Sequence, residues 1–147
     1  MKRTVILVLI GFLVWACANT DAANTTENKK TELKMAEWSE LALLMRDIHK
    51  DAKSWRKAID NGTFEQDSIA IYKLLVESKP TDEDVEGPVF EGFAQNYQMA
   101  LDSLMLSKNI DLAKAKYNNL VTACITCHQT YCPGPVKTIR KLYFPEG

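Results

Sequence analysis

"AKAKYNNLVTACITCHQTYC", residues 113–132, is the stretch that decides the fold expected for this chain. Its tyrosines, cysteines and aliphatic side chains recur at alternating steps of four and three, which places them on one face of an α-helix. The members of this stripe are Ala113, Tyr117, Leu120, Cys124, Cys127 and Tyr131. The helix is expected to end at Cys132, because the Pro-Gly-Pro that follows cannot continue it. The pattern therefore predicts a long helix that carries its cysteines on the inward side.

Three earlier segments show the same three- and four-residue spacing of apolar side chains and are also expected to be helical, over about 38–60, 64–79 and 90–107. In the first, one stripe comprises Trp38, Leu41, Met45, Ile48, Ala52, Trp55 and Ile59. Asn61-Gly62 should end this helix, and Thr63 should cap the second. Four helices with narrow apolar seams and no β-pattern predict an all-α chain, in the form of an antiparallel four-helix bundle.

Length and charge limit what the chain can be. Its 147 residues are 46% hydrophobic and 25% charged, which fits a single globular domain. Basic and acidic residues nearly cancel, with Lys+Arg 18 against Asp+Glu 19 and a net charge of -1. No electrostatic footprint of nucleic-acid binding is present, so nucleic acid is not an expected partner.

The N-terminal segment "MKRTVILVLIGFLVWAC" has the layout of an export signal. Lys2 and Arg3 precede an apolar run over 5–16 that is shorter than the roughly 20 residues of a membrane span. "VWAC" resembles a bacterial lipoprotein box with Cys17 as the lipidated first residue, whereas "ACA" also fits ordinary signal cleavage. The favoured expectation is a signal over 1–16, a flexible polar tether over 17–36, and a protein of the periplasm or cell envelope anchored only by lipid.

The pentapeptide Cys124 to His128 is the haem c attachment motif, C-x-x-C-H. On a helix, Cys124, Cys127 and His128 project from about the same side within one turn. Two thiols at this spacing form thioethers with a haem, and the adjacent imidazole binds the iron from one axial side. An exported chain also suits this reading, because haem c is attached outside the bacterial cytoplasm.

Other chemistries remain open for the same residues. Zinc is one alternative, although four ligands along one continuous helix cannot surround a tetrahedral ion. A dithiol redox site is another, but it normally lies at a helix N-terminus that follows a strand. A disulfide between Cys124 and Cys127 would need a geometry that residues one helical turn apart rarely present.

These features resemble the cytochrome c′ family, the class II c-type cytochromes. The resemblance covers about 39–131, and its specific part is "CITCHQTY" near the C-terminal end of the last helix. It implies a four-helix bundle over 37–132 with one covalent haem on its last helix, and a possible homodimer, because many relatives pair into dimers. Many relatives carry a basic residue where this chain has Cys132, and the tail over 133–147 extends past the end of many of them. Apolar residues in this tail could fold back on the bundle.

The family takes its distal haem face from the first helix, which raises the question of the sixth iron ligand. Met45 is the candidate, because it lies in the middle of the apolar stripe and its thioether can bind haem iron. Leu41 would instead leave that position empty, as in gas-binding relatives, and His49 is a third option.

The expected function follows from these assignments. The chain is predicted to be a monohaem electron carrier that exchanges electrons with other redox proteins and is not an enzyme. A five-coordinate haem protein that binds nitric oxide or carbon monoxide is the first alternative, and a zinc or dithiol module without haem is the second. Cys132 is expected to be a free thiol near the proximal haem face, with an intermolecular disulfide as the alternative.

Overall fold

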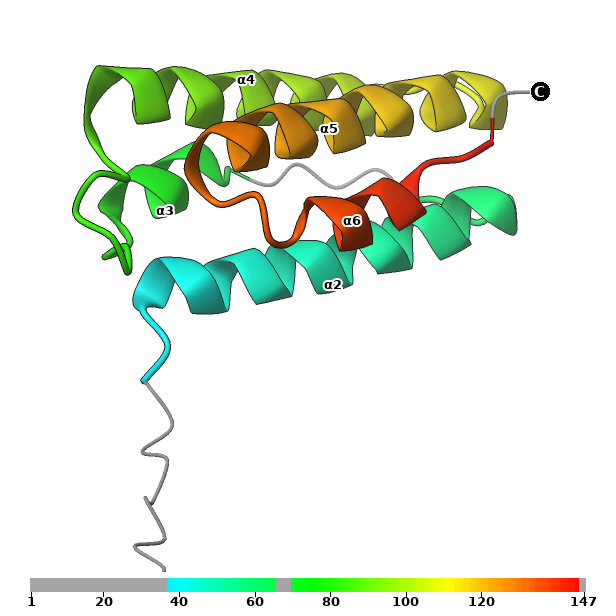
Figure 1. The fold of residues 1–147 in the computed structure, drawn as a ribbon. Coiled ribbons are helices and arrows are strands. Elements are labelled where there is room, and N and C mark those ends of the chain that lie inside the picture. Colours follow the sequence, from blue (N-terminus) through cyan, green and yellow to red (C-terminus); the bar gives the residue numbers. More distant parts are fainter. Residues whose placement is uncertain (1–36, 66–69, 146–147) are drawn as a thin grey trace, which may run out of the picture. The chain divides into compact units, whose positions relative to one another are not determined.

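The apolar stripes fold into helices, and the all-α prediction is confirmed. A computed structural model describes residues 37–65 and 70–145, and no strand is present among them (Figure 1). The elements are α2 (Glu40–Asp60), α3 (Tyr72–Glu77), α4 (Gly87–Met105), α5 (Ile110–Tyr131), α6 (Val136–Ile139) and the 3₁₀ turn η1 (Arg140–Leu142). None of the described helices is long and apolar enough to cross a membrane. The predicted signal, Cys17 and the predicted tether lie outside the described residues.

α2 has defined caps at both ends. The Ser39 hydroxyl oxygen accepts a hydrogen bond from the Ala42 amide at 3.2 Å, which fixes the start of the helix. At the other end, the Asn61 amide donates to the Lys57 carbonyl at 3.0 Å. Gly62 follows with φ of +71°, a conformation that glycine adopts at little cost. The predicted end of this helix at Asn61-Gly62 is therefore confirmed.

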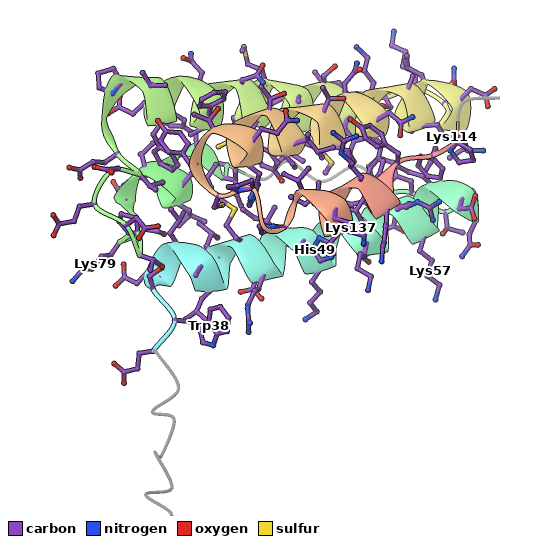
Figure 2. The ribbon with its side chains drawn as sticks, in the orientation of Figure 1. Trp38, His49, Lys57, Lys79, Lys114 and Lys137 are labelled. Carbon is purple, nitrogen blue, oxygen red and sulfur yellow. The ribbon has the colours of Figure 1, made fainter. Side chains whose placement is uncertain are left out.

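Trp38 does not belong to the inward stripe, and that prediction is wrong. The residue precedes the N-cap of α2 and is 53% exposed. Figure 2 shows it on the side of α2 away from the other helices. The guanidinium carbon of Arg46 lies 3.5 Å from its ring centroid, so a cation–π contact covers the indole instead of the core. The buried members of the stripe are Leu41, Ile48, Ala52 and Ile59.

The second predicted helix, over about 64–79, does not begin where the sequence predicts. Thr63 does not cap a helix; its amide donates to the Ala58 carbonyl at 2.9 Å and so belongs to the end of α2. Phe64 is not helical, and α3 begins only at Tyr72. A side chain of α4 caps the start of α3: the Gln98 Oε1 atom accepts hydrogen bonds from the Ile71 amide at 2.7 Å and from the Tyr72 amide at 2.9 Å. A tertiary cap, which local sequence cannot reveal, sets the start of α3.

α4 and α5 form an antiparallel pair that builds much of the core (Figure 1). The Asn109 side chain caps α5 by accepting from the Leu112 amide at 2.9 Å. α5 ends at Tyr131, with Cys132 as its C-cap, as the sequence predicts. The buried residues of the two helices are Phe90, Ala94, Tyr97, Leu101, Leu104, Met105, Ala113, Tyr117, Leu120, Val121, Ala123 and Ile125.

Tyr117 joins α5 to α2 through a hydrogen bond inside the core. Its side chain is 0% exposed, and its hydroxyl donates to the Ala52 carbonyl at 2.8 Å. We expect Tyr117→Phe to lower the free energy of unfolding by about 1 kcal/mol, because it removes one buried hydrogen bond without changing the ring. Urea unfolding measures this, with Tyr72→Phe as the control since Tyr72 is 37% exposed. Equal destabilisation by both changes would contradict the role given to the Tyr117 hydroxyl.

The chain after α5 folds back onto the helices, as expected from its apolar residues. α6 packs on α5, and η1 contacts both α5 and α2. Ile139, Leu142 and Phe144 are buried and belong to the same core cluster as the long helices. Val136 and Tyr143 are partly buried against that cluster. This segment is thus an integral part of the packing and carries residues to the site described next.

Candidate functional site

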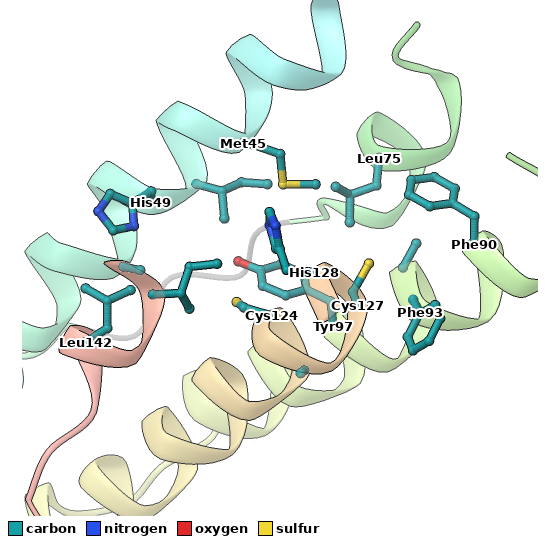
Figure 3. A pocket seen from close by; sticks show the side chains of 15 residues that line it. Met45, His49, Leu75, Phe90, Phe93, Tyr97, Cys124, Cys127, His128 and Leu142 are labelled. Atoms are coloured by element: carbon teal, nitrogen blue, oxygen red, sulfur yellow. The ribbon is translucent and has the colours of Figure 1, made fainter. Parts of the chain in front are cut away.

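A cavity of about 60 Å³ lies where α2, α4 and α5 meet the C-terminal segment. Figure 3 shows its lining: the imidazole of His128 rises from α5 toward Met45 on α2, with Cys124 and Cys127 beside it. Most other lining residues are apolar or aromatic. They include Ile48, Ala52, Leu75, Phe90, Phe93, Ala94, Tyr97, Ala123, Ile139 and Leu142. The three residues Cys124, Cys127 and His128 of the C-x-x-C-H sequence therefore converge on one apolar space.

Burial governs the acidity of the two motif thiols. Desolvation raises the pKa of Cys124 to about 12, and the neighbouring Cys127 adds to this effect. Desolvation likewise raises the pKa of Cys127 to about 11, with a contribution from Cys132. None of the three cysteines in the described part of the chain forms a disulfide. In this structure both motif sulfurs are neutral thiols at ordinary pH.

His128 is oriented by the residue four positions later. Its Nδ1 lies 3.3 Å from the Cys132 carbonyl oxygen and 3.0 Å from the Cys132 Sγ. In the tautomer with the proton on Nδ1, the ring donates to that carbonyl and keeps the Nε2 lone pair free. Desolvation lowers the pKa of His128, which favours the neutral imidazole that metal binding needs. Ligand histidines are commonly held through their other nitrogen in this way.

Met45 lies between two adjoining hollows. A second space of about 140 Å³ adjoins the cavity and shares with it Met45, Phe90, Cys127 and His128. Leu41 lines only this second space, whereas His49 lines only the first. Of the three candidates for the distal position, Met45 alone borders both. Desolvation and the nearby Lys53 lower the pKa of His49, so it too is neutral near pH 7.

The donor set fits a covalently bound haem in its chemistry. Two thiols, an imidazole with Nε2 free and an opposing thioether line one space whose other walls are largely apolar. The space itself is small, because sites that bury a drug-sized ligand measure about 300 to 1,000 Å³. The lining side chains or whole elements must therefore move apart to hold a macrocycle.

The zinc and dithiol readings of the motif have their own structural requirements. Among residues 37–65 and 70–145, no group of three or more His, Cys, Asp or Glu could hold a metal ion. Cys124 and Cys127 lie well inside α5, and their raised pKa values are the opposite of what an activated dithiol requires.

Several residues that line the cavity could not be identified from the amino-acid sequence. Leu75 and Tyr97 come from α3 and α4, and Ile139 and Leu142 come from the C-terminal segment. For the last two, the apolar residues of the tail were the available signal, but they could not show which surface the tail would cover. Tyr97 lies in the predicted helix over 90–107, and a place in a helix does not distinguish a packed residue from one that lines a site.

The structure predicts an order of thiol reactivity in the protein without haem. Cys132 is exposed and should react first with a thiol reagent, then Cys127, and Cys124 last. At pH 8 a thiol with the pKa of Cys124 is roughly one part in ten thousand thiolate, so its rate should rise about tenfold for each pH unit below about 11. Peptide mass spectrometry after timed labelling measures this order. Equal rates at all three positions in the folded protein would contradict it.

A scan against models of protein families, a search of curated proteins and a search of solved structures found no match to this chain.

Proposed function

We propose that this chain is a monohaem c-type cytochrome that carries electrons between other redox proteins. The observation that carries this proposal is the convergence of Cys124, Cys127 and His128 on one apolar cavity, opposite Met45. Two thiols, an imidazole and a thioether in such a space match the requirements of a covalently attached, axially ligated haem. In this proposal the chain is an electron carrier and catalyses no reaction of its own.

Each residue has a separate part in the proposed site. Cys124 and Cys127 would hold the haem through two thioether bonds, and His128 would offer Nε2 to the iron while its Nδ1 faces the Cys132 carbonyl. The Met45 thioether would be the second protein donor to the iron. The haem supplies a one-electron iron couple when bound. The apolar walls exclude water, which favours the iron state of lower charge and so raises the reduction potential.

The architecture that goes with this proposal is a four-helix haem bundle. α2, α4 and α5 supply its long helices, and α3, with six residues, occupies the fourth position only in part. The proposal also includes export to the periplasm or cell envelope, with Cys17 as the lipid anchor and residues 17–36 as the tether.

A second candidate function is the binding of a small gas at a five-coordinate haem. The space of about 140 Å³ between Leu41 and His128 favours it, because this space offers room beside the iron-binding imidazole. Its apolar lining would suit nitric oxide or carbon monoxide. The two functions differ in whether Met45 binds the iron.

Visible spectra of protein matured in a host that attaches haem c test the proposal. The spectra are recorded oxidised, reduced, and reduced under carbon monoxide. A low-spin spectrum that carbon monoxide does not change is expected for the electron carrier. A high-spin spectrum that shifts with the gas would favour the second candidate, and no haem band at all would overturn both.

A further inference from the structure

The C-terminal segment, residues 136–144, is attached to two different helices. On α5, the Asn118 side chain donates to the Phe144 carbonyl at 3.2 Å and accepts from the Phe144 amide at 2.9 Å. The Thr122 and Tyr143 hydroxyls are 2.9 Å apart. On α2, Arg56 Nε donates to the Leu142 carbonyl at 3.0 Å. The segment therefore bridges the helix that carries the attachment motif and the helix that carries Met45.

The Phe144 ring anchors the end of the segment. It is buried and makes an edge-on contact with the Tyr117 ring, with centroids 5.4 Å apart. Two cations cover it: the Arg56 guanidinium carbon is 4.9 Å and the Lys114 nitrogen 5.8 Å from its centroid. Aromatic and cation–π contacts of this kind add to the burial of the ring. Asn118 and Phe144 together form a latch at this end.

The same segment reaches the cavity. Ile139 and Leu142 are 6% exposed each, and both line the space that also contains Cys124, Met45 and His128. Figure 3 shows Leu142 near His49, with the segment running beside the end of the cavity. Ile139 and Leu142 belong to the C-terminal segment and not to α2, α4 or α5. The side of the cavity that they form therefore depends on the Asn118–Phe144 latch for its position.

We propose that residues 136–144 are the wall that closes the haem cavity, and that Ile139 and Leu142 limit the access of solvent and small ligands to it. This inference rests on the proposed function for the identity of the ligand, but the wall itself is a property of the folded chain. An apolar wall here excludes water from the sulfur and imidazole donors. Its release would expose them without removing any proposed haem ligand.

Two changes release the wall to different extents. Ending the chain after Pro135 removes it, and Asn118→Ala removes both hydrogen bonds that hold the Phe144 backbone. Asn119→Ala is the matched control, because Asn119 is the exposed neighbour on α5. Circular dichroism of all variants checks that the helices persist, and Asn118→Ala keeps the test valid if the shortened chain does not fold.

The first measurement uses protein without haem and follows thiol labelling of Cys124. We expect labelling at least about tenfold faster in the shortened chain, a smaller increase in Asn118→Ala, and no change in Asn119→Ala. Unchanged labelling of Cys124 in a folded shortened chain or in Asn118→Ala would overturn the inference, whatever the chain binds.

The second measurement uses haem-loaded protein that carries Met45→Leu, so that the iron can bind carbon monoxide, and follows the rate of carbon monoxide binding after reduction with the wall intact or released. We expect the rate to increase severalfold when the wall is released, with the covalent haem retained. Retained haem with an unchanged rate would overturn the wall and leave the proposed function intact. A full-length chain without any haem would overturn the proposed function, while the labelling of Cys124 would still decide on the wall.

Discussion

A chain in which alanine replaces both Cys124 and Cys127 is expected to carry no covalently bound haem after production in a host that matures c-type cytochromes. The two thiols line the cavity together with His128, and each forms one of the two thioether bonds in the proposed site. Without them, any haem in the cavity is held only by its axial ligands and by packing. Haem staining after denaturing electrophoresis measures the covalent fraction directly.

Cys132→Ala is the matched control for this change. Cys132 is exposed and does not line the cavity of about 60 Å³, although its Sγ lies 3.0 Å from His128 Nδ1. We expect this variant to keep its covalent haem and to show at most a small spectral change, since the carbonyl that accepts from Nδ1 remains. Staining of the double variant, or loss of staining in Cys132→Ala, would contradict the assignment of the three cysteines.

Met45→Leu is expected to change the haem from low-spin to high-spin and to make the reduced protein bind carbon monoxide. Leucine conserves most of the volume of methionine but removes the thioether, so packing changes little while the proposed axial ligand is lost. The reduction potential should fall as well, because a methionine ligand raises it. Visible spectra with and without carbon monoxide, together with a redox titration, measure these effects.

Leu41→Ala separates ligation from packing in this experiment. Leu41 is 7% exposed on the same helix, one turn before Met45, and its truncation should cost about 2 to 4 kcal/mol of stability. It should nevertheless leave the spectrum low-spin. A Met45→Leu protein that remains low-spin and does not bind carbon monoxide would contradict ligation by Met45, and would direct attention to His49.

The sequence was sufficient to predict the helices whose buried residues recur at steps of three and four. The end of α2 at Asn61-Gly62 and the end of α5 before the prolines were both readable, because glycine and proline act through the local backbone. Trp38 was misplaced because the apolar spacing of the sequence continues past the N-cap Ser39, whereas the helix does not. The backbone is already extended at the N-cap, so the spacing no longer places a side chain before it on the buried face. α3 was misplaced because Gln98, a residue on another helix, determines its first turn.

The candidate site shows the same division between local and tertiary information. Cys124, Cys127 and His128 share one side of a helix by spacing alone, so their convergence could be predicted from the sequence. Leu75, Tyr97 and Leu142 join them only through packing between elements distant in the chain. Local sequence contains no signal for such contacts, and the wall formed by the C-terminal segment became visible only in the folded structure.

The intact mass of the mature chain, measured after extraction with acidified organic solvent, tests the central claim most directly. The extraction removes haem held by axial ligands alone, whereas thioether bonds survive it. We predict a single species whose mass includes one haem in addition to the lipid on the proposed anchor Cys17, with the haem mass on the peptide that contains Cys124 and Cys127. A chain whose mass contains no haem, from a host shown to mature other c-type cytochromes, would contradict the account.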